Sequence, residues 1–364
     1  MNLRIPGPTP CPEDVLQAGA QQMIDHRGPE FKDMISRIHS GLQTAFQTKN
    51  QIAILTNSGT GAMEAAIVNT LSAGDRVLSI SIGVFGDRFA EIAEAYGVDV
   101  VKRKVAYGEA ANPEEIGKAL KSDGSIKAVF ITHNETSTGV TNDLEAISQV
   151  VREYDRLLLV DAISSVGCIP VPMDAWDLDV VVTGSQKGFM VPPGLAFAAV
   201  GPRALEAAKS ATLPRFYFDF SRAFSYYDQG QTPWTPAVSV MFSLDLALKN
   251  MLADGMGSVY EKHVRIANEV RSGVKSLGLE LFPANEQIAS NTVTAVKVPE
   301  GVQLSNLRGK LRSDKNIVVA GGQGSLSGKI FRVGHMGYIT DEDVADVMSA
   351  LKSVLPEVGF TVSS

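Results

Sequence analysis

The chain has 364 residues, 45% hydrophobic and 20% charged, which is long enough for two domains with well-buried cores. A formal net charge of −7 and the lack of a basic run argue against binding to nucleic acid or to a membrane surface. Two distant cysteines, Cys11 and Cys168, argue against a disulfide framework, and without a signal-peptide or membrane-spanning run we expect a cytoplasmic protein.

The first two hundred residues predict alternating strands and helices. Residues 1–20 are rich in proline and predict an extended arm, and apolar side chains at helical spacing predict a helix over residues 30–47. Seven apolar runs then predict strands over residues 52–55, 77–80, 98–101, 128–131, 157–160, 180–182 and 195–200. Helical patterns between them cover residues 62–71, 87–96, 113–121 and 143–153. Apolar strands separated by helices indicate an α/β fold with a seven-stranded, mostly parallel sheet flanked by helices.

The remainder of the chain predicts a second, smaller unit. Residues 201–236 form a weakly patterned, aromatic-rich connection, and helical patterns follow over residues 238–252 and 259–277. Strand-like pieces follow over residues 279–282, 292–298, 317–319 and 330–333. They alternate with helical patterns over residues 304–311 and 341–355. We therefore expect an N-terminal arm, a large domain and a small C-terminal α+β domain, with bounds at residues 1–20, 21–254 and 255–364.

A lysine follows the sixth predicted strand. Lys187 lies in a turn between Gly184 and Gly188, and apolar residues and a Pro-Pro-Gly follow. An ammonium group beside an apolar site is shifted towards its neutral form, and a neutral amine attacks carbonyl carbon. The alternative is an ordinary solvated lysine in a loop.

An aspartate ends the fifth predicted strand. A carboxylate at Asp161 would face the crevice where open α/β sheets bind ligands. Two alternatives remain open at this point, a helix cap and a buried structural aspartate bonded to nearby backbone.

A glycine-rich turn follows the first predicted strand. Small and hydroxyl side chains at a helix start suit a phosphate group, and this turn reads Ser58-Gly59-Thr60-Gly61. It is neither a Walker A loop nor a GxGxxG motif, since Glu64 stands where the third glycine belongs, which disfavours a nicotinamide-dependent dehydrogenase. A plain strand-to-helix turn is the alternative. We expect a second glycine-rich stretch, residues 321–324, to be a loop.

Two further polar features complete the pattern. The loop at residues 133–139 follows the fourth strand, and we expect its side chains to contact a ligand. His133 and Glu135 are not taken as metal ligands, because the other histidines are dispersed and form no HExxH motif. Arg332, in a predicted strand of the small domain, would bind a carboxylate through its guanidinium fork, unless it is simply a surface arginine.

These features combine into one chemical interpretation. An anion cradle, a polar loop, an acid and a lysine follow strands of one sheet, and a second domain adds a carboxylate-binding arginine. A cofactor with a phosphate, a basic ring nitrogen and an aldehyde would use all of them, and pyridoxal 5′-phosphate is such a cofactor.

The chain resembles a class V, fold type I pyridoxal-phosphate aminotransferase of the alanine–glyoxylate/serine–pyruvate group. The resemblance extends from the PGPTP segment at residues 6–10 to residue 334, and its most specific pieces are LLLVDAISSVG and VTGSQKGFMVPPG. It implies an enzyme that transfers an amino group from alanine or serine to glyoxylate or pyruvate. Which donor and which acceptor are used does not follow from the sequence.

The resemblance also implies roles for residues at the strand ends. Lys187 would attach covalently to the cofactor, and Gln186 would contact its phosphate. Asp161 would pair with the protonated pyridine nitrogen. Thr136 would hydrogen-bond the cofactor, and the ring of Phe85 would stack on the pyridine.

Three further roles come from the same resemblance. Arg332 would hold the substrate carboxylate. Thr232 and Thr235 would reach the phosphate from the neighbouring subunit of a homodimer, with Thr232 replacing a tyrosine of some relatives. The phosphate cradle would consist of Ser58, Gly59 and Thr60.

Other functions of the same fold are the alternatives. An aminotransferase for a phosphonate substrate or for ureidoglycine would use the same machinery with a different pocket. A cysteine desulfurase needs a thiolate on a loop near the site, and residues 315–330 contain no cysteine. A non-catalytic subunit is disfavoured because Lys187 and Asp161 are both present.

Overall fold

The computed structural model describes residues 1–362. The seven predicted strands of the large sheet are confirmed, with the bounds β2 Gln51–Leu55, β3 Arg76–Ser81, β4 Asp99–Lys104, β5 Ile126–Thr132, β8 Leu157–Asp161, β9 Val180–Gly184 and β10 Ala196–Val200. Their order across the sheet is β2-β10-β9-β8-β5-β3-β4. β10 alone runs opposite to the other six strands, so the sheet is mostly parallel as predicted.

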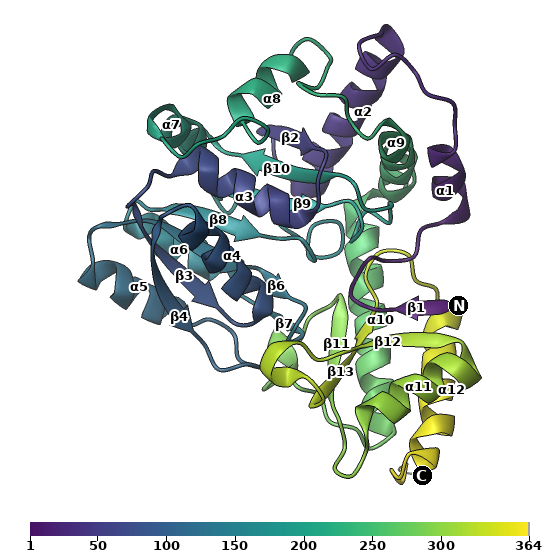
Figure 1. Cartoon of the computed structure of the whole chain (residues 1–364). Coiled ribbons are helices and arrows are strands. Elements are labelled where there is room, and N and C mark those ends of the chain that lie inside the picture. Colours follow the sequence, from purple (N-terminus) through teal and green to yellow (C-terminus); the bar gives the residue numbers. More distant parts are fainter. Residues whose placement is uncertain (363–364) are drawn as a thin grey trace.

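Helices cover both faces of this sheet (Figure 1). One face packs against α2 Pro29–Phe46, α5 Pro113–Ser122, α6 Leu144–Glu153 and α9 Val238–Leu252. The other packs against α3 Gly59–Thr70, α4 Val84–Ala95, α7 Pro202–Ser210 and α8 Phe220–Tyr227. Strand residues alternate between the two cores: Val180 and Val182 enter one, and Val181 enters the other. Burial on both faces explains why these strands read as continuous apolar runs.

A second, four-stranded sheet lies beside the large one (Figure 1). Its strands, in the order β1-β12-β13-β11, are β1 Asn2–Arg4, β12 Ile317–Gly321, β13 Ile330–Gly334 and β11 Val293–Lys297. A third hydrophobic core joins it to α10 Gly255–Ser276, α11 Leu304–Lys315 and α12 Asp341–Glu357. A two-stranded ribbon and two short 3-10 helices are also present: β6 Asn134–Glu135, β7 Val140–Thr141, η1 Glu286–Ile288 and η2 Gly324–Leu326.

Three sequence-based expectations differ from the structure. The arm is extended at β1 but not throughout, because it also contains the helix α1 Glu13–Gly19, whose seven residues are too few for a periodic signal. The expected strand over residues 279–282 is wrong, since only Leu281 forms a single bridge, to Val296. The connection over residues 201–236 holds α7 and α8. The bounds of the three predicted parts remain a prediction.

No helix among residues 1–362 combines the length and the apolar character needed to cross a membrane.

Candidate active site

The carboxyl ends of the strands open into one small cavity. Its volume is about 170 Å³, and it lies where β9, β8 and β5 end and where α3 and α4 begin. Strand order makes this meeting possible, because β9, β8 and β5 are neighbours and parallel. The residues predicted for the site that line it are Ser58, Gly59, Thr60, Phe85, Thr136, Asp161, Gln186 and Lys187.

Lys187 lies in the cavity wall and is held by the N-terminal arm. Its Nζ donates a hydrogen bond to the Pro6 carbonyl oxygen at 2.5 Å. Thr9 of the same arm donates through its N–H to the Gln186 carbonyl at 3.0 Å and through its hydroxyl to the Lys187 carbonyl at 3.1 Å. Burial lowers the pKa of Lys187 to about 8, against the opposing charge of Asp161. The alternative of a solvated loop lysine is therefore wrong.

Asp161 is buried at the end of β8. One carboxylate oxygen accepts the Ile163 N–H at 2.9 Å, and the other accepts the Thr132 hydroxyl at 3.3 Å. Burial raises the pKa of Asp161 to about 6, and these two donors and Lys187 oppose the rise. The aspartate is thus bonded to nearby backbone, as one alternative anticipated, and it also lines the cavity.

The turn before α3 leaves its hydrogen-bonding groups available to a ligand. Ser58 is the N-cap, yet its side chain makes no capping hydrogen bond, and no acidic residue lies in the first helical turn. A Cβ on Gly59 would stand 2.5 Å from Ile163 Cδ1, so a larger residue at this position would displace the Ile163 side chain. The open N-terminus of α3 therefore favours an anion.

The Glu135 side chain binds the start of α4, next to the cavity. Its buried carboxylate accepts the Phe85 N–H at 3.0 Å, the Gly86 N–H at 3.1 Å and the Ser137 hydroxyl at 2.6 Å. These bonds hold Phe85 in the cavity wall. His133 is buried against Trp176, and burial lowers its pKa to about 4. Across residues 1–362, no three histidine, cysteine or acidic side chains gather as metal ligands would.

Three residues of the predicted site lie outside the cavity wall. Arg332 is buried, and its guanidinium donates to the carbonyl oxygens of Gly321 at 2.7 Å and of Thr136 at 2.9 Å. Burial lowers the pKa of Arg332 to about 10. Thr232 donates to the Trp234 carbonyl at 2.7 Å, and like Thr235 it does not line the cavity of its own chain.

Sequence reasoning missed three residues of the cavity wall, namely Arg88, Ile163 and Ser164. Asn134, in the loop expected to contact a ligand, also lines the cavity. Asn134 joins the cavity to the small sheet, since its amide donates to Ser164 Oγ at 2.7 Å and to Thr292 Oγ1 at 2.9 Å. A usable signal existed for Arg88, because it lies three residues after Phe85 and falls within the helix predicted over residues 87–96.

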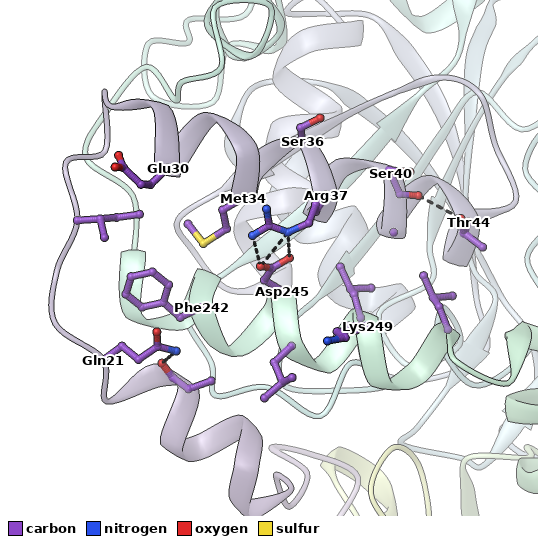
Figure 2. Close-up of a pocket in the computed structure, with 16 residues that line it drawn as sticks. Gln21, Glu30, Met34, Ser36, Arg37, Ser40, Thr44, Phe242, Asp245 and Lys249 are labelled. Atoms are coloured by element: carbon purple, nitrogen blue, oxygen red, sulfur yellow. Dashed lines mark hydrogen bonds and ion pairs between the residues drawn. The ribbon is translucent and has the colours of Figure 1, made fainter.

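A larger hollow lies away from these residues, between α1, α2 and α9 (Figure 2). Its volume is about 960 Å³, and it shares no lining residue with the cavity at Lys187. Arg37 and Asp245 pair across it at 2.6 Å, and Met34 and Phe242 add apolar surface (Figure 2). It holds none of the side chains expected to react, so we assign it no catalytic chemistry.

A family model, sequence relatives and solved structures each match nearly the whole chain. The family described as aminotransferase class-V matches residues 2–347. A protein named soluble hydrogenase, small subunit, from a Synechococcus strain is 45% identical over 99% of this chain and 94% of its own length. A serine–glyoxylate aminotransferase of Methylorubrum extorquens is 33% identical over 100% of this chain and 92% of its own. The crystal structure of an alanine–glyoxylate aminotransferase from Nostoc sp. superposes with a TM-score of 0.93, at 32% identity over 97% of this chain and 94% of that one.

Proposed function

The chain belongs to the class V aminotransferases, and we propose that it moves an amino group from alanine or serine to glyoxylate or pyruvate. The family makes it a transaminase that depends on pyridoxal 5′-phosphate. One observation carries the assignment to this cavity. A lysine with a lowered pKa, a buried aspartate and an open helix N-terminus line the same 170 Å³ space.

The residues present fit the cofactor. The Gln186 side-chain oxygen is buried without a hydrogen-bond partner among the described residues, and a buried polar atom of that kind points to a missing ligand. Turning the amide would aim its NH₂ group at a phosphate held over the start of α3. In this proposal Asp161 meets the ring nitrogen, Phe85 covers one ring face and Thr136 adds a hydrogen bond. The turn that holds the phosphate consists of Ser58, Gly59 and Thr60.

Bound there, pyridoxal phosphate supplies an aldehyde and a ring that accepts electrons. Lys187 would act twice: its neutral amine would be the nucleophile that attaches the cofactor, and once the substrate amine has displaced it, the freed amine would accept the proton from the substrate Cα on its Nζ. Asp161, with a pKa of about 6, is mostly ionised at pH 7, and a positive ring nitrogen beside it favours that charge further. Its carboxylate thus keeps a proton on the nitrogen.

Arg332 orients the substrate in this mechanism. Its Nε and Nη2 both donate to the Gly321 carbonyl, at 2.9 Å and 2.7 Å, which fixes the plane of the guanidinium. Nη1 donates to the Thr136 carbonyl and, at 3.3 Å, to Gln323 Oε1. A substrate carboxylate would replace the longer bond to Gln323 and lie on the Nη1–Nη2 edge. The Cα–H bond would then be held in one direction relative to Lys187.

The proposal includes a homodimer. Thr232 and Thr235 lie on a loop that does not reach the cavity of its own chain, and a second copy would bring them to the phosphate. Arg27 ties this loop to the start of α2 by donating to the Thr232 carbonyl at 3.4 Å. Phe216 nearby is 65% exposed and stacks on Trp234, which leaves an apolar surface for a partner. Size-exclusion chromatography with light scattering tests this, and a monomer at micromolar concentration would contradict it.

A donor panel tests the reaction itself. Alanine, serine, ureidoglycine and an aminophosphonate would be assayed against glyoxylate and against pyruvate, with kcat/KM as the measure. We expect alanine or serine to give the highest value, and activity with another donor alone would overturn the substrate assignment. Lys187→Ala is the matched control, with no turnover and no covalently held cofactor expected.

A catalytically silent subunit is the second candidate, since the Synechococcus relative is named as a subunit of a hydrogenase. It predicts no turnover with any donor, although the protein would still bind the cofactor. A cysteine desulfurase fits less well. Cys168 is buried, which raises the pKa of its thiol to about 12, and no cysteine lines the cavity within the described residues.

A further inference from the structure

One cationic side chain in the cavity wall has no role in the mechanism above. Arg88 of α4 places its guanidinium carbon 4.8 Å from the centre of the Phe85 ring. Its Nη1 lies 3.5 Å from the Thr60 hydroxyl, in the turn that begins α3. Neither contact is an ion pair, so within residues 1–362 the charge of Arg88 is matched by aromatic and hydroxyl groups only.

The negative charge of a phosphate bound in the cavity would need a positively charged side chain beside it. The wall contains two cationic residues, Lys187 and Arg88. A phosphate monoester carries about −1.5 to −2 charge at neutral pH, whereas a helix N-terminus supplies about half a positive charge. Lys187 cannot serve as the lasting counter-charge, because its amine is used in attachment. Arg332 lies outside the wall and donates to carbonyl oxygens.

We propose that Arg88 is the cationic partner of the cofactor phosphate, with its guanidinium N–H groups donating to phosphate oxygens over Thr60. The bond would be charge-assisted and directional, which suits a planar fork. The contact with the Phe85 ring fixes the position of the Arg88 guanidinium. This role rests on the proposed placement of the cofactor, and it gives α4 two functions, since Phe85 covers the ring and Arg88 neutralises the phosphate.

The experiment compares two ligands that differ in the phosphate alone. Cofactor-free wild-type protein, Arg88→Gln and Arg88→Lys would be titrated with pyridoxal phosphate and with pyridoxal, and dissociation constants read from cofactor absorbance. Arg103→Gln is the matched control, because Arg103 is exposed on β4 and does not line the cavity. Pyridoxal affinity reports an intact site in every variant.

We expect Arg88→Gln to weaken pyridoxal phosphate binding about 10- to 100-fold, as loss of a charge-assisted hydrogen bond does. Pyridoxal binding should change less than about twofold, and Arg88→Lys should recover part of the loss because it restores the charge. An equal loss for both ligands would overturn the proposal, since Arg88 would then act through Phe85. Unchanged binding of both ligands would overturn it too, and a raised KM for an acidic donor alone would assign Arg88 to substrate. Failure of wild-type protein to take up pyridoxal phosphate would instead contradict the proposed function.

Discussion

The reactivity of Lys187 should depend on pH in a way that its surroundings dictate. Burial lowers its pKa from 10.5 to about 8. At pH 7.5 roughly a quarter of such amines are neutral, against roughly one in a thousand for an unshifted lysine. In cofactor-free protein the neutral fraction of Lys187 should therefore be about two hundred times that of an exposed lysine, and Lys187 should acylate faster for that reason.

The substitution Asp161→Asn tests how the neighbouring carboxylate affects the pKa of Lys187. The negative charge of Asp161 raises the pKa of Lys187 and so opposes the effect of burial. Replacing the carboxylate with an amide removes that charge and leaves the burial, so the pKa of Lys187 should fall below about 8. Nearly isosteric asparagine keeps the packing around Ile163.

Competitive labelling with isotopic acetic anhydride between pH 6 and pH 11, followed by mass spectrometry of the Lys187 peptide, measures this midpoint. Exposed lysines of the same digest serve as the internal reference. A wild-type midpoint near that of the exposed lysines would refute the effect of burial. A midpoint that rises in Asp161→Asn would refute the assigned sign of the carboxylate's contribution.

Three further predictions concern other residues. Arg332→Gln should raise the KM of the amino donor about 10- to 100-fold with a smaller change in kcat, because it removes a charged contact to the carboxylate, and an unaltered KM would remove Arg332 from the site. Gly59→Ala should lower the free energy of unfolding by about 1–3 kcal/mol, since its Cβ would stand 2.5 Å from Ile163 Cδ1, and adding Ile163→Ala should recover part of the loss in a denaturant titration. Burial raises the pKa of Asp179 from 3.8 to about 7, so the folded state binds its proton more tightly than the unfolded state, and this stabilisation is lost as pH rises through that window. In Asp179→Asn, the free energy of unfolding measured with urea should therefore decrease less between pH 4 and pH 7 than in the wild type. An equal decrease in both proteins would contradict the raised pKa of Asp179.

Much of the fold was open to prediction because its signals are local. Seven apolar runs separated by helical patterns indicated a mostly parallel sheet, and the structure confirms it. Parallel strands direct their carboxyl ends to one edge, so motifs that follow different strands must meet there. This is why Ser58, Thr136, Asp161 and Lys187 could be grouped before any contact was known, and all four line one cavity.

The sequence by itself thus determined the strands, their shared edge and the kinds of side chain that meet there. Tertiary structure alone decided that Pro6 would accept the hydrogen bond of Lys187, that Glu135 would hold Phe85, and that the fork of Arg332 would be held by backbone carbonyls. These contacts join segments far apart in the chain and often involve main-chain atoms. Hydrophobic periodicity records only which face of an element is buried, so it carries no trace of them.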